Sequence, residues 1–506
     1  MMKMVMKMNP SRLFSAATLR FSRSFVTMAP VMGGGVRGAS LYKRLSALAY
    51  NGATVEDTMN KFVNDGNFAT KFEIDSCIKE LRKYGQYPLA LAVMEWMMYK
   101  SGIGFAPTDI AKYLDLTAKV KGISAAEYYF SGLLPAEIHK STYGALLNCY
   151  CKEKLADKAH ALFEEMNKMG IVSSIAFNNI MTLYMKLHQP EKVPGLIQEM
   201  KNRNMPLDMF SYIIWMDSYS SLSDVESVER VFEEVKLNYG EQKYDWTILS
   251  NLASAYVNAG LNEKAELALR ELEKKILNMK RLDRRPLHYL LNLYAETSNL
   301  AEVHRIWAGM KSAFKVTTNI STLHMLKALA KLDDVNGLKS IFEEWESTCP
   351  SYDERLAKTA IVLYLKHGMV EEAGRVFEQV VKRCKGPYYR YWEMLMSYYL
   401  EKHEIDTALG CLKAAISEVE NNEWYPTPED VSRFMEHFKK DGDVNSAEMF
   451  CEMLKKLKPL DHVAYKLLLE IYVAASKIAP EMRRRIMDDG VEISSELEDL
   501  LRKVLP

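Results

Sequence analysis

The sequence is poor in the residues that mark linkers, disulfide scaffolds and metal sites. Its 506 residues include only 7 cysteines, 24 glycines and 16 prolines. No two cysteines are spaced C-x-x-C, the kind of short spacing from which structural zinc sites draw their ligands, so we expect no metal site. We interpret the cysteines as buried thiols of a protein kept in a reducing compartment. The low glycine and proline content leaves little room for long linkers.

The chain also lacks a net charge and a long apolar run. Its 66 basic residues are balanced by 66 acidic ones. Binding to nucleic acid must therefore come from a local face rather than from bulk charge. No run of 18 apolar residues occurs, so we expect no membrane insertion.

Acidic residues are absent from the first 55 positions, and the first one is Glu56. Eight basic residues lie in the same span: Lys3, Lys7, Arg12, Arg20, Arg23, Arg37, Lys43 and Arg44. Arginine, serine and apolar residues without acids are typical of an organellar transit peptide; the alternative is a disordered basic tail. We predict a leader over residues 1–40, a cleaved presequence that directs the chain to the mitochondrial matrix. The cleavage site and dual targeting to the chloroplast are left open.

Catalytic signatures are missing as well. The ten histidines are dispersed, and the chain has no H-E-x-x-H, G-x-S-x-G or G-x-x-x-x-G-K motif. We expect no catalytic residue, no cofactor and no enzymatic activity.

The chain does contain an internal repeat. The 24 residues from Tyr143 to Met166 are echoed, 34 residues later, from Phe177 to Met200. With the opening aromatic taken as position 4 of a unit, equivalent residues follow at steps of 33 to 39 residues: Ile74, Ile110, Tyr143, Phe177, Tyr212, Leu249, Leu287, Thr322, Ala357, Trp392, Val431 and Tyr465. A period near 35 over twelve units predicts a helical solenoid.

Within each unit, apolar residues recur at helical spacing. Position 11 is usually tyrosine and position 20 usually alanine, whereas position 24 is phenylalanine in five units and position 27 is methionine in four. This spacing predicts two helices whose apolar faces are buried by stacking on neighbouring units. We therefore assign the tyrosine and methionine stripes to the core.

Three families of helical repeat have this period. Position 8 is large in nearly every unit, which argues against the tetratricopeptide pattern, and the T-P-L-H start of ankyrin is absent. Position 13 is often lysine, and five units close with aspartate at position 35: Asp208, Asp245, Asp283, Asp353 and Asp461. With these features the chain resembles the pentatricopeptide repeat (PPR) family, and its flanks resemble the pure-repeat (P-type) plant mitochondrial subgroup.

The resemblance implies an all-α, right-handed α-solenoid of about twelve helix-turn-helix repeats. It places an N-terminal helical cap over residues 41–71, the repeat array over 72–475 and a C-terminal helical cap over 476–506.

The resemblance also implies single-stranded RNA bound along the first helices, about one base per unit. Positions 5 and 35 would read the base edge: Asn178 with Asp208, Ser250 with Asp283, and Ser432 with Asp461. Ile175 and Phe210, at position 2 of consecutive units, would clamp the base that Asn178 reads, a pyrimidine with uracil preferred. Other units carry Ile213, His288, Leu323, Lys358 or Glu393 at position 5. Two or three readable units supply little discrimination among many RNA sites.

Basic residues recur at two other positions. We predict phosphate contacts by a lysine ladder at position 13 and by arginines at position 2: Lys83, Lys119, Lys152, Lys186, Lys331, Lys366, Lys440, Arg285, Arg355 and Arg390. The alternative for the lysines is a favourable interaction with the helix macrodipole at an exposed helix end. The cluster Arg483–Arg485 has the same two interpretations, an RNA contact or a basic patch that caps a helix.

Our first functional prediction is a mitochondrial single-stranded RNA-binding protein that acts in organellar RNA processing, stability or translation. The alternative is a structural subunit of the mitochondrial ribosome, or of another ribonucleoprotein, that contacts ribosomal RNA and proteins.

Overall fold

The computed structural model describes residues 38–48, 54–65, 70–99, 103–134, 138–240, 243–279, 282–419 and 424–505. Their regular secondary structure is helical, which confirms the predicted all-α class. They form two compact units, one ending at Leu293 and the other beginning at Tyr294. The predicted leader, residues 1–40, lies outside the described residues except for its last three positions.

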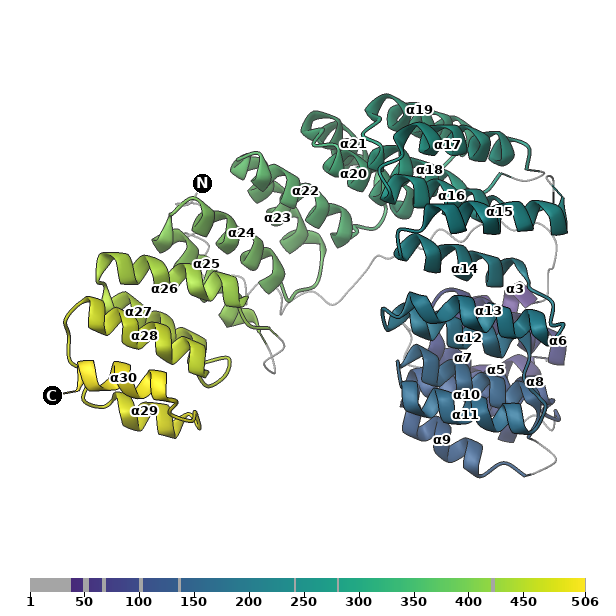
Figure 1. Ribbon diagram of the computed structural model, residues 1–506, viewed down its shortest axis with the longest axis horizontal. Coiled ribbons are helices and arrows are strands. Elements are labelled where there is room, and N and C mark those ends of the chain that lie inside the picture. The colour runs from purple at the N-terminus through teal and green to yellow at the C-terminus, as the bar shows by residue number, and fades with distance from the viewer. Residues whose placement is uncertain are drawn as a thin grey trace. The chain divides into compact units, whose positions relative to one another are not determined.

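The N-terminal unit consists of helical hairpins stacked in chain order (Figure 1). Its elements are α3 (Gly38–Ser46), α5 (Val55–Asn64), α6 (Lys71–Lys83), α7 (Tyr87–Tyr99), α8 (Pro107–Lys121), α9 (Ile123–Ser131), α10 (Lys140–Lys152), α11 (Ala156–Lys168), α12 (Ser174–Lys186), η1 (Pro190–Lys192), α13 (Val193–Asn202), α14 (Met209–Ser221), α15 (Val225–Tyr239), α16 (Trp246–Asn258), α17 (Asn262–Leu277) and the start of α18 (Arg284–Glu296).

The C-terminal unit continues the same pattern from the end of α18. Its helices are α19 (Leu300–Ala313), α20 (Asn319–Lys331), α21 (Val335–Thr348), α22 (Glu354–Lys366), α23 (Val370–Arg383), α24 (Tyr389–Glu401), α25 (Ile405–Glu418), α26 (Pro428–Asp441), α27 (Val444–Lys455), α28 (His462–Ala474), α29 (Met482–Asp488) and α30 (Ser495–Val504).

The first helix of each of the twelve predicted repeats begins three residues before its position-4 residue, as the repeat register requires. The residue just before these helices, at position 35 of the preceding unit, is often an N-cap. The Asp208 carboxylate accepts a hydrogen bond from the Ser211 N–H, and the Asp461 carboxylate accepts one from the Ala464 N–H. Such a cap satisfies a backbone N–H that the helix itself leaves unpaired. The aspartates at position 35 therefore have a structural role that the sequence analysis missed.

The turn inside each hairpin uses a left-handed residue at position 15. Lys154 has φ 57°, Ser223 has φ 58° and Gly260 has φ 72°. This conformation reverses the chain after the first helix, and glycine adopts it without steric cost. Because the turn recurs, the second helix of each repeat packs against the first helix of the same repeat.

The core follows the predicted stripes. The alanines at position 20 are almost completely buried, as expected where two helices pack closely: Ala90, Ala126, Ala159, Ala265, Ala373, Ala408 and Ala447. The position-27 methionines Met97, Met166, Met200 and Met310 are buried as well. The core prediction thus holds for these methionines and for four of the eight position-11 tyrosines. The buried tyrosines are Tyr150, Tyr256, Tyr294 and Tyr364, whereas Tyr184, Tyr219, Tyr399 and Tyr472 are half-buried.

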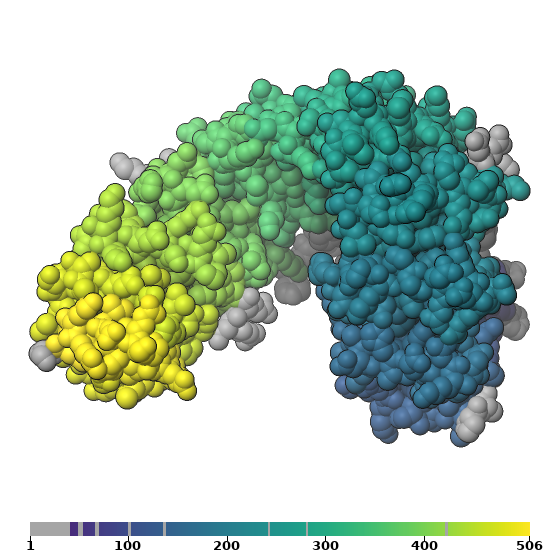
Figure 2. Space-filling model, viewed as in Figure 1, coloured from purple at the N-terminus to yellow at the C-terminus, as the bar shows by residue number. Residues whose placement is uncertain are grey.

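Successive repeats contact each other through their first helices. In the N-terminal unit α10 packs on α12, α12 on α14, and α14 on α16; in the C-terminal unit α22 packs on α24, α24 on α26, and α26 on α28. Within each unit the surface colours in Figure 2 consequently follow the order of the chain. This stacking places equivalent positions of neighbouring first helices in a row.

Polar contacts also join neighbouring repeats. Tyr256, at position 11, donates a hydrogen bond to Glu229 of the preceding repeat over 2.8 Å, and the Lys264 ammonium lies 2.7 Å from the same carboxylate. These two donors hold the pKa of Glu229 below its usual value. Tyr472 and Glu448 form the equivalent bond over 2.7 Å near the C-terminus. Tyr256 and Tyr472 thus each pack a ring against the neighbouring repeat and bond its carboxylate through the hydroxyl, whereas the Tyr364 hydroxyl is buried without a partner.

The cysteines do not form disulfides. Five of the seven are buried, whereas Cys349 and Cys384 are half-buried, so the buried-thiol prediction holds for five. Among the described residues, no three or more histidine, cysteine, aspartate or glutamate side chains are arranged to hold a metal ion. In the same ranges no helix is long and apolar enough to cross a membrane.

Candidate nucleic-acid interface

Asn178 sits in a polar network that joins two repeats. Its amide nitrogen donates to Asp208 Oδ1 over 3.2 Å, and its amide oxygen accepts from the Ser211 hydroxyl over 2.8 Å. Asn178 is only 3% exposed. Because both ends of the amide are bonded, its orientation is set by the neighbouring repeat. The structure thus brings the predicted pair together, and it adds Ser211, which the sequence analysis did not single out.

Two exposed apolar side chains lie at position 2 of the two helices that carry this network. Ile175 and Phe210, the predicted clamp, are 66% and 52% exposed. Exposed apolar residues also occupy position 2 in other repeats: Phe72, Ile320 and Val463. Large apolar groups held in solvent at one repeated position are suited to stacking against a planar ligand. These three residues share a position with the predicted clamp, and the repeat register alone would have found them.

The second predicted pair is arranged differently. Ser250 is 4% exposed, and its hydroxyl has no hydrogen-bond partner. The Asp283 carboxylate accepts from Arg285 instead: from Nε over 2.8 Å and from the backbone N–H over 3.1 Å. The Arg285 guanidinium holds the pKa of Asp283 below its usual range. In this repeat the Ser250 hydroxyl has no partner, and Asp283 bonds Arg285 instead of Ser250.

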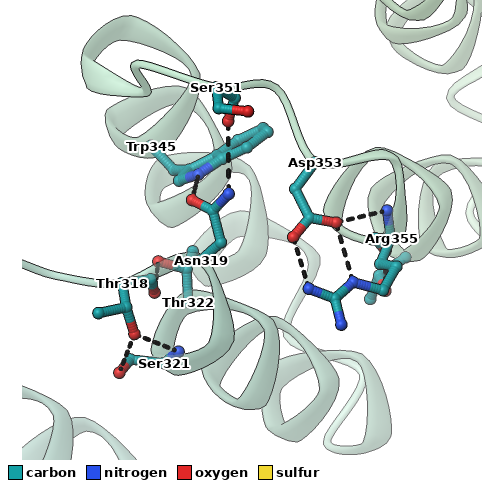
Figure 3. A network of polar contacts seen from close by, with 9 residues as sticks. Thr318, Asn319, Ser321, Thr322, Trp345, Ser351, Asp353 and Arg355 are labelled. Atoms are coloured by element: carbon teal, nitrogen blue, oxygen red, sulfur yellow. Dashed lines mark hydrogen bonds and ion pairs between the residues drawn. The ribbon is translucent and has the colours of Figure 1, made fainter. Parts of the chain in front are cut away.

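Asp353 and Arg355 form the same kind of pair in the C-terminal unit (Figure 3). Arg355 Nε lies 3.0 Å from Asp353 Oδ1, and Nη2 lies 2.7 Å from Oδ2. The preceding repeat boundary has no aspartate: Thr318 accepts from the Ser321 N–H over 3.2 Å. Asn319 joins this boundary to the next, because its amide accepts from Trp345 Nε1 over 2.9 Å and donates to the Ser351 carbonyl over 3.3 Å.

The third predicted pair is less engaged. Asp461 caps α28, its carboxylate lies 3.9 Å from Lys458 Nζ, and Ser432 is half-buried. Glu429, at position 2 of the Ser432 repeat, lies 2.7 Å from Arg433. Within this set the structure therefore shows the Asn178–Asp208 contact as a direct hydrogen bond between the two predicted reading residues.

Position 5 offers no free polar group to a base in two of the other repeats. Leu323 is buried, and the Glu393 carboxylate accepts from Trp424 Nε1 over 2.8 Å. Glu393 also lies 3.2 Å from Arg390, whose guanidinium is 5.3 Å from the Tyr389 ring centre. Arg390 is thus engaged by its own helix.

Several lysines of the predicted ladder meet carboxylates. Lys119 and Lys152 lie 2.7 and 3.1 Å from Asp115, and Arg82 lies 2.8 Å from it. Burial alone would raise the pKa of Asp115, but the two ammonium groups outweigh burial and hold it below the usual range. Since three cations share one carboxylate, these four side chains carry two positive charges in excess. Sequence spacing did not reveal this convergence, because the four residues come from three different repeats.

The remaining ladder residues have varied surroundings. Lys83 lies 3.5 Å from Glu80, Lys366 lies 2.5 Å from Asp333, and Lys331 forms an ion pair with Glu296. Lys186 Nζ donates to the Cys151 carbonyl over 3.4 Å, and Lys440 is exposed. The ladder therefore combines lysines held by ion pairs with lysines whose charge is not matched by a carboxylate.

The three arginines near the C-terminus are engaged in ion pairs. Each guanidinium meets a carboxylate: Arg483 with Glu498, Arg484 with Glu481, and Arg485 with Glu448. Arg485 and Glu448 form two parallel contacts of 2.7 and 2.6 Å, the bidentate geometry of a strong ion pair. These contacts favour the second of the two interpretations of this cluster, a patch that organises the terminal helices.

Comparison with known proteins agrees with the repeat pattern. A model of the PPR repeat matches residues 141–171, 175–205, 210–238 and 358–384. Two Arabidopsis thaliana proteins named as mitochondrial pentatricopeptide repeat-containing proteins are each 43% identical to the chain; one alignment covers 93% of the chain and 87% of the relative, the other 92% of each. The large ribosomal subunit protein mL101 of Arabidopsis thaliana is 37% identical, over 92% of the chain and 94% of the relative.

The fold is also similar to that of a solved structure. The crystal structure of the pentatricopeptide repeat protein PPR10 in complex with an 18-nucleotide psaJ RNA element superposes with a TM-score of 0.50 at 16% identity. The match covers 83% of this chain and 65% of that one. At this identity the similarity supports the repeat architecture.

Proposed function

The chain belongs to the pentatricopeptide repeat family, and we propose on that premise that it binds single-stranded RNA along its row of first helices. The observation that carries the proposal is the Asn178–Asp208–Ser211 network between two exposed apolar side chains. A base that stacks between Ile175 and Phe210 would meet the edge of the Asn178 amide, whose orientation is already set. Preorganised polar groups cost little to order on binding.

The mechanism is occupancy. RNA held extended along the first helices is shielded from nucleases and kept out of competing base-paired structure, and no catalytic step by this chain is required. The names of the relatives and the acid-free leader support action in the mitochondrial matrix after removal of a presequence, with an effect on processing, stability or translation of an organellar transcript.

A second function is favoured by a specific observation. Leu323 and Glu393 occupy reading positions without being able to address a base, and one relative is a large ribosomal subunit protein. A solenoid in which few units read bases suits a permanent place in a ribonucleoprotein. There, shape and phosphate contacts with ribosomal RNA, together with contacts to mitochondrial ribosome proteins, would replace base reading.

Ultraviolet crosslinking in isolated mitochondria, followed by sequencing of the attached RNA, tests both functions. A short footprint in one messenger RNA is expected for a transcript-specific factor. A footprint in ribosomal RNA would establish the second function instead. Absence of any crosslinked RNA above background would contradict RNA binding altogether.

Replacing Asn178 by alanine is expected to weaken base preference at one nucleotide by roughly 5-fold, the lower range for loss of one good base contact. The Asp208 cap and the two apolar side chains remain, so overall affinity should change less than preference. Selection of a randomised single-stranded RNA library by wild type and variant, followed by sequencing, measures this.

Asn179→Ala is the matched control, since it changes the next residue on the same helix, whose amide nitrogen has no hydrogen-bond partner. Equal preferences for wild type and Asn178→Ala, or equal losses in both variants, would show that Asn178 does not read a base.

A further inference from the structure

At two repeat boundaries, the aspartate at position 35 forms an ion pair with the arginine at position 2 of the following repeat. Arg285 contacts Asp283 through Nη2 at 2.6 Å and Nε at 2.8 Å, and Arg355 contacts Asp353 through Nη2 at 2.7 Å and Nε at 3.0 Å. In each pair the backbone N–H of the arginine also donates to the carboxylate. In each pair a single residue separates the arginine from its aspartate, so the contact requires no residue from another helix.

The boundary after Asn178 is built from neutral donors instead. Asp208 accepts from the Asn178 amide and from the Ser211 N–H, and position 2 is Phe210. The carboxylate is thereby directed at the position-5 side chain. At the Asp283 boundary the position-5 hydroxyl of Ser250 is buried without a partner.

Helix stability does not explain these arginines. Arg285 and Arg355 lie in the first turn of α18 and α22, where a cation opposes the helix macrodipole. Their side chains are 77% and 62% exposed. The Asp283 and Asp353 side chains are 35% and 14% exposed, but a guanidinium as exposed as these two adds little to folding. The arginines are better explained by what they present to a ligand.

We propose that Arg285 silences base reading by the Ser250–Asp283 repeat and converts it into a unit that contacts the RNA backbone. The proposal rests on the proposed RNA-binding function. The guanidinium occupies the carboxylate oxygens that a base edge would need, and it neutralises a charge that would repel phosphate. Its exposed donors remain available to a phosphate oxygen. Arg285 is therefore a specificity-determining residue that acts by lowering specificity.

The Asp353 repeat provides a control within the chain. It has the same arginine–aspartate pair, but position 5 is the buried Leu323, which cannot bond a base edge. Releasing Asp353 should therefore reveal no base preference, whereas releasing Asp283 should. Both releases remove one cation from the same repeat position.

The test is selection of a randomised 16-nucleotide single-stranded RNA library by the full chain, its Arg285→Ile variant and its Arg355→Ile variant. Isoleucine already occupies position 2 elsewhere, as Ile175 and Ile320. Arg285→Ile is expected to gain at least a roughly 3-fold base preference. The preference should appear two nucleotides from the one read by Asn178, because one repeat lies between the Asn178 repeat and the Ser250 repeat. Arg355→Ile should gain none. Each variant should lose about 0.7 from the slope of log affinity against log salt, the value of one phosphate contact.

A second substitution tests the carboxylate itself. Asp283→Asn keeps a side chain that caps helices well. Added to Arg285→Ile, it should abolish the gained preference, and in the wild-type background it should leave preference unchanged.

The outcomes distinguish silencing by Arg285 from RNA binding itself. If wild type selects RNA with a preference that depends on Asn178, but Arg285→Ile adds none, or behaves like Arg355→Ile, then silencing by Arg285 is wrong and RNA binding stands. If wild type enriches no RNA, the proposed function fails and the silencing fails with it.

Discussion

Glutamine in place of Glu448 is expected to raise amide hydrogen exchange in α28–α30 by roughly 30- to 150-fold, as loss of about 2 to 3 kcal/mol of local stability requires. Glu448 on α27 accepts from Tyr472 on α28 and from both terminal nitrogens of Arg485 on α29. The side chains of Arg485 and Glu448 are only 29% and 22% exposed. Removing one partner leaves the other charge partly buried and unpaired, which costs more than loss of an exposed pair.

The effect should be local because repeat proteins are stabilised between neighbours. Exchange in α22 and α23, several helices away, is expected to change little. Arg483→Gln is the matched control: it breaks the bond to Glu498 at a side chain that is 40% exposed, and its effect should be small. Equal exchange in wild type and Glu448→Gln would show that this ion pair does not hold the terminal helices.

The same pair predicts a pH dependence. Burial alone would raise the pKa of Glu448, but hydrogen bonds from Arg485 and Tyr472 outweigh burial and lower it. A lowered folded-state pKa contributes stability that is present above the unfolded value, about 4.3 for glutamate, and is lost as pH falls through the folded value. The difference in exchange between wild type and Glu448→Gln, corrected for the intrinsic effect of pH, should therefore shrink as pH falls below about 4. A difference that grows on acidification would contradict this assignment.

The repeat architecture was predictable because the same residue pattern occurs in twelve repeats. A period near 35 placed the start of every first helix, and the buried alanines at position 20, such as Ala159 and Ala265, follow from the close approach of two helices. Each such inference depends on residues within one unit or on equivalent positions of neighbouring units. Averaging over twelve units removes the exceptions.

The polar contacts were not predictable in the same way. Asp115 forms ion pairs with Arg82 and Lys152 from the two flanking repeats. The residue at the position of Asp115 differs from repeat to repeat, so the repeat pattern does not predict these contacts. Asp283 and Arg285 are separated by a single residue in the sequence, yet the family pattern assigns the two residues to separate tasks. Whether a carboxylate faces a ligand or its own neighbour depends on side-chain direction, which residue spacing does not determine.

Replacing Lys152 and Lys186 together by glutamine is expected to weaken binding to single-stranded RNA of any sequence by roughly 10-fold at 0.15 M salt, and to lower the salt slope by about 1.4. Lys152 adds to the excess positive charge around Asp115, and Lys186 donates to a backbone carbonyl rather than to a carboxylate. Lys152 shares Asp115 with two other cations, and Lys186 contacts a carbonyl, so neither ammonium has to break an exclusive ion pair to bind phosphate. Filter binding of one fixed RNA at several salt concentrations measures both quantities.

Glutamine is preferred to charge reversal because of Asp115. Glutamate at position 152 would place a second carboxylate beside a largely buried one and destabilise the repeat boundary, which would imitate a loss of binding. With glutamine, Arg82 and Lys119 still neutralise Asp115. The matched control is Lys158→Gln with Lys264→Gln, which removes the same charge from second helices, where each lysine pairs with a glutamate. If the ladder only favours the helix macrodipole, Lys152→Gln with Lys186→Gln will lower thermal stability and leave the salt slope equal to that of the control. If it follows the RNA backbone, the slopes will differ while both variants remain folded.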